Sequence, residues 1–186
     1  LLHPGLCTTL LLYLSTTLAL APSPPSRLIL PKGLVLISPW VDLSLSTYLP
    51  HADDLLNPTM LANASNSYLQ NLFAPLSPPA APGSPHALGS QHPFFSPALP
   101  SSLPTLQLLE KAYADLDPLR IIVFSGSAEL LAPEIAGFVK NLRKVARVET
   151  EWVMEKDEVH VFPVFPHFVS EARGRAIARI GRFMQA

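Results

Sequence analysis

The sequence has little that would support several common classes of protein. It holds one cysteine, Cys7, in 186 residues, so no disulfide can form within the chain. No spacing of His and Cys resembles a zinc site, and no glycine-rich loop of the phosphate-binding kind occurs. Positive charge is not in surplus, with 13 Lys and Arg against 14 Asp and Glu and a formal net charge of -1. These absences argue against a disulfide scaffold and a nucleotide-binding or nucleic-acid-binding protein, and no metal or organic cofactor is implied.

Charged side chains are also absent from the leucine-rich stretch before Arg27. A secretory signal would carry basic residues ahead of its apolar core, and a membrane span needs roughly 20 apolar residues, whereas Ser and Thr interrupt this run. A membrane-anchored helix followed by an unrelated domain is disfavoured for the same reasons. We interpret residues 4–20 as a buried helix of a chain whose natural beginning is missing, because the first residue is Leu1. This interpretation favours a cytoplasmic or endomembrane-associated location over secretion.

What the sequence does contain is typical of a globular protein with one core. Apolar residues make up 48% of the chain and charged residues only 15%. The length fits one domain, so we treat residues 1–186 as a single unit.

Apolar periodicity predicts strands that alternate with helices. Continuous apolar runs bounded by Gly and Pro are typical of strands buried on both faces, and apolar residues at helical spacing follow two of them. Strands that alternate with helices indicate an α/β protein with a mostly parallel sheet covered by helices. The expected strands are 33–39, 120–124 and 149–154, and the expected helices are 134–147 and 167–184.

The segment 44–104 is expected to be lid-like. It contains one possible helix, Met60–Phe73, and then nine prolines between Pro75 and Pro104. Because proline lacks the backbone N–H, neither a regular helix nor a central strand should persist through that run. A long loop of this kind usually is either the cover of an active site or a disordered insert.

The residues that directly follow each strand are the candidates for chemistry, since ligands of open parallel sheets bind beyond the carboxyl ends of the strands. Ser38 and Asp42 follow the first expected strand, Glu129 follows the second and His160 follows the third. A carboxylate after one strand and a histidine after the next match the acid-then-base order of a Ser…Asp/Glu…His triad on an α/β-hydrolase sheet.

Four motifs carry a more specific resemblance. ISPWVDLS at 37–44, HPFFSPAL at 92–99, GSAELL at 126–131 and His-Val-Phe at 160–162 resemble the hormone-sensitive-lipase-like division of the α/β hydrolases, fold-3. The resemblance covers most of the chain and is greatest to fungal esterases of the steryl-acetate-hydrolase type. It implies an α/β-hydrolase fold with its N-terminal strands missing, and a small hydrophobic ester as substrate.

The resemblance makes His160 the general base and Glu129 the acid that orients it. Three alternatives stay open. Asp117 lies in an Asp-Pro-Leu motif that often holds the acid, but here it precedes the strand; Glu134 lies one helical turn into the next helix; and Glu129 could be a solvated helix-start carboxylate. His160 could likewise be an ordinary loop histidine. The other histidines, Trp40 and Asp42 are expected to be structural, with Trp40 as a packing anchor and Asp42 as a loop hydrogen-bond acceptor.

The family's serine nucleophile and its oxyanion segment have no counterpart in the sequence. Matching the leucine-rich helix to the family places the nucleophile at about position 1, where the chain has Leu1. We therefore expect a truncated carboxylester hydrolase whose parent forms an acyl-enzyme. The alternative is a catalytically dead hydrolase-fold relic that binds a hydrophobic ligand. The sequence leaves the oligomeric state open.

Overall fold

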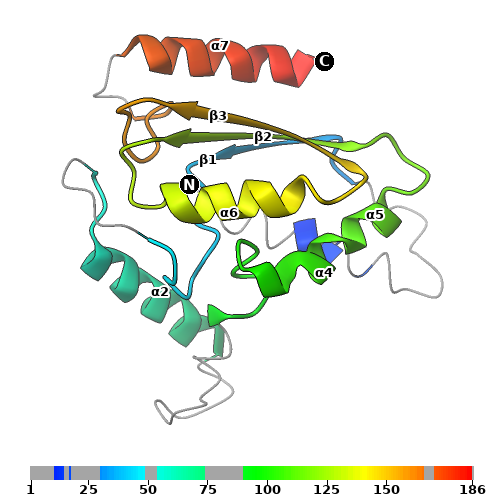
Figure 1. Ribbon diagram of the computed structural model, residues 1–186, viewed down its shortest axis with the longest axis horizontal. Helices are drawn as coiled ribbons and strands as arrows, with labels where there is room; N and C mark the ends of the chain where they lie inside the picture. Colours follow the sequence, from blue (N-terminus) through cyan, green and yellow to red (C-terminus); the bar gives the residue numbers. More distant parts are fainter. Residues whose placement is uncertain are drawn as a thin grey trace.

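A three-stranded parallel sheet forms the centre of the protein. The computed structural model describes residues 11–14, 17, 30–48, 54–73, 90–165 and 170–185. Its strands are β1 (Gly33–Ile37), β2 (Leu119–Gly126) and β3 (Val148–Glu155), in the order β1-β2-β3. Both pairs are parallel, so the carboxyl ends of all three strands meet at one edge (Figure 1). The α/β fold with a parallel sheet is confirmed.

Helices cover both faces of the sheet. Helix α6 (Ala132–Leu142) lies on one face and α7 (Glu171–Gln185) on the other (Figure 1). Because side chains of a strand alternate between faces, β2 contributes to two separate cores. The larger core, on the α6 side, includes Ile121, Val123, Ile135 and Phe138; the smaller, on the α7 side, includes Ile122, Phe124, Ala172 and Ala176.

The expected helix boundaries are shifted by a few residues. Helix α6 begins before Glu134 because Pro133 fits its first turn, where a missing N–H costs nothing, and it ends at Leu142 rather than Arg147. Helix α7 ends close to the expected residue, and residues 166–169 lie outside the described ranges. Of the helix expected over 4–20, residues 11–14 and 17 are helical, and the rest also lies outside them.

The helix predicted in the lid-like segment is confirmed as α2 (Pro58–Phe73), where the Asn57 side chain accepts a hydrogen bond from Met60 N at 2.9 Å. The expectation that no helix persists up to Pro104 is wrong at the end of the run. A 3₁₀ turn (Pro100–Ser102) and α4 (Leu103–Leu106) form there, followed by α5 (Leu108–Ala112). Pro100 and Pro104 occupy first-turn positions of their helices, where proline is tolerated. Residues 74–89 lie outside the described ranges.

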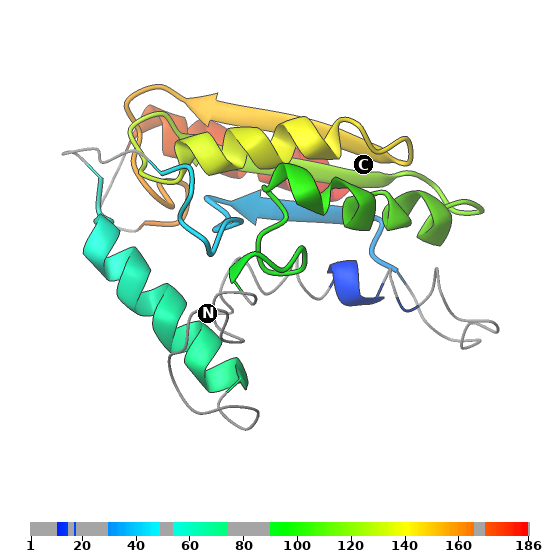
Figure 2. The same ribbon diagram turned by 60° about the horizontal axis from the view of Figure 1, so that its bottom comes forward.

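Helix α2 begins near the carboxyl ends of the strands and runs away from the sheet (Figure 2). None of the helices within the described ranges combines the length and the hydropathy that a membrane crossing requires.

Candidate active site at the carboxyl edge of the sheet

Two loops meet beyond the carboxyl ends of β2 and β3. We call residues 126–131 the acid turn and residues 156–162 the histidine loop. Ala128 N donates to Glu158 O at 3.0 Å, and Asp157 N donates to the Ser127 hydroxyl at 2.8 Å. The structure therefore brings the segments of Glu129 and His160 together, as expected for residues that follow neighbouring parallel strands.

Ser38 connects these loops from the end of β1. Its hydroxyl donates to Glu129 Oε2 at 2.6 Å and accepts from Val161 N at 2.9 Å. The side chain is fully buried, and its backbone has φ 42°, a left-handed conformation that costs energy for a residue other than glycine. Val161 also has a left-handed backbone, with φ 53°. One strained serine thus joins the carboxylate of the acid turn to the residue after His160.

Glu129 is held in an environment that disfavours its charge. Only 2% of the residue is exposed, and besides Ser38 its Oε2 accepts from Gly126 N at 3.2 Å. Burial raises the pKa of the carboxyl to about 7; the two hydrogen bonds oppose this shift, and the negative charge of Asp54 adds to it. The second oxygen, Oε1, has no hydrogen-bond partner among the described residues. Oε1 of Glu129 can therefore accept a hydrogen bond from a further donor.

This raised pKa predicts that the protein loses stability as the pH rises from acidic to neutral. A carboxyl whose pKa is higher in the folded state contributes stability that is fully present below pH 4.5 and is lost as the pH rises through about 7. The midpoint of urea unfolding should therefore fall between pH 5 and pH 8, and it should fall less in Glu129→Gln, which cannot ionise. Glu134 shifts in the same direction and stays in both proteins, so some decline remains. An equal fall of the urea midpoint in the wild type and in Glu129→Gln would show that ionisation of Glu129 does not cause the loss of stability.

Asp54 joins the same two loops from outside the sheet. Its Oδ2 accepts from Leu130 N at 2.5 Å and its Oδ1 accepts from His160 N at 3.1 Å. The sequence does not single out Asp54, because nothing in the polar loop before α2 distinguishes it from its acidic neighbour Asp53. The sequence places Ser38 at a strand end but does not predict its role as a link.

Glu134 serves a different turn. Its Oε1 accepts from Val41 N at 2.8 Å and from Asp42 N at 3.2 Å, and the residue is 1% exposed. Burial raises its pKa well above the usual range. Glu134 therefore fixes the backbone that follows Ser38, which leaves Glu129 as the carboxyl that contacts both Ser38 and the acid turn.

The expectations for Trp40 and Asp42 are confirmed. Trp40 is buried and donates from Nε1 to Asp42 O at 3.1 Å. The Asp42 carboxylate is a loop acceptor for backbone and hydroxyl donors of Ser44 and Ser46 and for the hydroxyl of Thr47.

The segment 92–99 is docked by its serine and by α6. Ser96 Oγ accepts from Leu43 N at 2.8 Å, and the Asn141 amide donates to the carbonyls of Ala98 and Leu99, each at 3.1 Å. His92 is exposed and lies edge-on to Phe94, with ring centroids 5.0 Å apart. These contacts give His92 a local packing role, as the sequence suggested.

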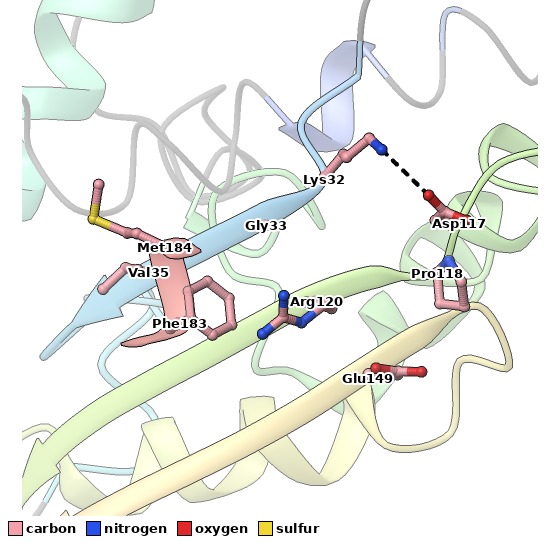
Figure 3. A pocket seen from close by; sticks show the side chains of 9 residues that line it. All are labelled: Lys32, Gly33, Val35, Asp117, Pro118, Arg120, Glu149, Phe183 and Met184. Carbon is pink, nitrogen blue, oxygen red and sulfur yellow. Dashed lines mark hydrogen bonds and ion pairs between the residues drawn. The ribbon is translucent and has the colours of Figure 1, made fainter. Parts of the chain in front are cut away.

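Asp117 lies at the opposite end of the strands. It precedes β2, its side chain is 79% exposed, and it pairs with Lys32 at 3.3 Å. Both residues line a groove of about 710 Å³ at the amino ends of the strands (Figure 3). In the same groove the Arg120 guanidinium lies 4.7 Å from the centre of the Phe183 ring. Asp117 and Glu129 are thus separated by the length of β2.

The parallel sheet, the helices on its two faces and the polar residues at its carboxyl end are the parts expected of an α/β-hydrolase fold, and the comparisons with solved structures show that fold. No family model matches the sequence, and no curated protein does. Solved structures do match. EstE7, a hormone-sensitive-lipase homologue from a metagenome library, is 25% identical with a TM-score of 0.64, and the match covers 98% of this chain and 50% of EstE7.

Two further structures show the same arrangement. EstE5 is 20% identical with a TM-score of 0.67, covering 98% of this chain and 49% of its own. Carboxyl esterase 2 from the mycorrhizal fungus Tuber melanosporum is 19% identical with a TM-score of 0.57, covering 98% and 51%. The chain spans about half the length of these proteins, and the resemblance to hormone-sensitive-lipase-like esterases is confirmed.

Proposed function

We propose that this chain supplies the acid and the base of a serine carboxylester hydrolase. Glu129 orients His160, and His160 activates a serine that an upstream segment contributes. The observation that carries the proposal is the hydrogen-bonded link Glu129–Ser38–Val161, which holds a buried carboxyl and the histidine loop at the same strand-end edge.

The chemistry of each residue follows from this placement. The imidazole of His160 takes the proton of the serine hydroxyl as the serine oxygen attacks the ester carbonyl, and it returns that proton to the departing alcohol. The imidazolium formed in between is stabilised by the Glu129 carboxylate. The same positive charge favours ionisation of Glu129, which opposes the effect of burial on its pKa. A water molecule then hydrolyses the acyl-enzyme with His160 again as base.

Three described serines near this end of the sheet fit other roles. The exposed Ser127 belongs to the acid turn, where its hydroxyl accepts from Asp157 N at 2.8 Å. The hydroxyl of Ser38 is fully buried and donates to Glu129, and that of Ser125 is buried and accepts from Trp152 Nε1 at 2.9 Å. A nucleophile must instead be exposed to substrate and donate to the base. The proposal therefore assigns the nucleophile and the oxyanion hole to a segment upstream of Leu1.

Hydrolysis of short-chain p-nitrophenyl esters tests the proposal. This chain should be inactive, and an extended form, which adds the segment encoded upstream of Leu1, should be active because it contributes the serine elbow. Changing the elbow serine to alanine in the extended form is the matched control and should abolish the activity.

Each other outcome has a definite meaning. An upstream segment without an elbow serine, or no activity in either form, would replace the proposal with a relic that binds a hydrophobic ligand without turnover. Activity in the short chain would show that the nucleophile lies within residues 1–186.

A further inference from the structure

The acid turn and the histidine loop are joined by a second carboxylate that the proposed reaction does not use. Asp54 bonds Leu130 N, the residue directly after Glu129, and the backbone N–H of His160 itself. We propose that Asp54 is a positioning residue, which sets the separation between the acid and the base by holding both backbones with one carboxylate. This inference rests on the proposed function.

The contacts have the properties that such a role requires. Oδ2 of Asp54 accepts from Leu130 N, and Oδ1 accepts from His160 N and also, at 2.7 Å, from the adjacent Leu55 N. Hydrogen bonds to a carboxylate are stronger than those to a neutral acceptor. Leu130 is 1% exposed and packs in the larger core, so the bonded backbone at that end is fixed. The histidine loop follows β3, which has a neighbouring strand on one side only in the described sheet. We therefore expect the contact with Asp54 to order this loop more than the acid turn.

Ser38 and Asp54 hold the loops from different directions. Ser38 comes from the end of β1 and contacts the Glu129 side chain and Val161 N. Asp54 comes from the residues that lead into α2 and contacts only backbone. The spacing of the acid–base pair therefore depends on the position of the residues that lead into α2, and a displacement of α2 would also move the backbone of His160.

Asp54 also acts on the pair through its charge. Among the described residues, the groups that contact the acid turn or act on its Glu129 carboxyl are the Ser38 hydroxyl, Asp54, the Glu134 carboxyl and the histidine loop. A negative charge at Asp54 disfavours the carboxylate of Glu129. Removing that charge should lower the pKa of Glu129, an effect that loosened packing alone does not predict.

Asp54→Asn is the decisive variant. It keeps the shape of the side chain, removes its negative charge and replaces one acceptor oxygen by an NH₂ group that faces a backbone N–H. Asp157→Asn is the matched control. Asp157 lies in the histidine loop with a side chain 82% exposed, and asparagine tolerates its left-handed backbone at φ 59°. It removes the same charge nearby without touching either bond of Asp54.

Amide hydrogen exchange on the chain of 186 residues tests the inference without any need for activity. In Asp54→Asn, exchange at Leu130 and His160 should accelerate by roughly tenfold or more, because one amide then faces a donor and the other loses a charged acceptor. Exchange at Val161, which Ser38 holds, should change little, and Asp157→Asn should leave all three amides as they are. Unchanged exchange at Leu130 and His160 in Asp54→Asn would overturn the proposal.

Kinetics in the extended form provide the functional readout. Asp54→Asn should lower kcat by about tenfold or more with a smaller change in KM, and it should move the acidic limb of the kcat/KM profile to lower pH. A fall in rate with an unmoved limb would reduce Asp54 to a structural residue and overturn the positioning role. An inactive extended wild type would refute the proposed function alone, because the exchange result would still report on Asp54.

Discussion

Replacing His160 by alanine in the extended form should lower kcat/KM for a short-chain ester by about four orders of magnitude or more. Loss of the general base leaves the serine hydroxyl protonated and the departing alcohol without a proton donor. Initial rates on p-nitrophenyl acetate measure the effect. The expected loss is large because no other described histidine lies at this edge: His92 is exposed and contacts Phe94 in a different segment.

His92→Ala is therefore the control for His160→Ala and should retain most of the activity. Glu129→Ala should also reduce the rate strongly, and the double variant with His160→Ala should be little worse than His160→Ala alone, since residues that act as one unit are not additive. Asp117→Ala should be nearly neutral, because its carboxylate is exposed beside Lys32 at the other end of β2. An extended form that kept its esterase activity without His160 would require a different base.

The elements of the sheet could be predicted from the sequence because burial imposes a simple pattern on them. β1 and β2 are short apolar runs, and α6 and α7 repeat apolar residues at helical spacing. The helices that follow Pro97 were missed because a proline count does not say which prolines occupy first-turn positions. In the first turn of a helix the missing N–H of proline has no cost, so helices begin where the prolines were expected to prevent them.

The candidate site likewise has one part that could be predicted from the sequence and one part that could not. Glu129 and His160 could be proposed because each follows a strand and because the motifs around them resemble a known family. Their supports could not, since Ser38 is 123 residues away from Val161 and Asp54 is 106 residues away from His160. Periodicity describes neighbours along a helix or strand, whereas these contacts depend on how three loops are stacked at the sheet edge. The left-handed backbone of Ser38, followed by a proline, is a local conformation that no composition rule indicates.

The acid turn and the histidine loop pack closely at Gly126, and Gly126→Ala should destabilise the protein by about 3 kcal/mol. An added Cβ would lie 1.9 Å from Glu158 O, 2.4 Å from the carbonyl carbon of Glu158 and 3.0 Å from Val159 N. These are backbone atoms, so the clash cannot be relieved by rotating a side chain. The histidine loop would have to move away from the acid turn, which would stretch the bond of Ala128 N to Glu158 O and displace His160 two residues later.

Urea unfolding of the two glycine variants Gly126→Ala and Gly181→Ala measures this effect against a matched background. Gly181 lies in α7 with nothing within 4 Å of an added Cβ, so its alanine variant should be neutral or more stable by up to about 1 kcal/mol. In the extended form Gly126→Ala should also lose activity in excess of its unfolded fraction, because the separation of acid and base changes in the molecules that remain folded. A Gly126→Ala protein with wild-type stability and wild-type kcat would show that the two loops are not packed against each other. That result would contradict the proposal that Ser38 and Asp54 hold the two loops together.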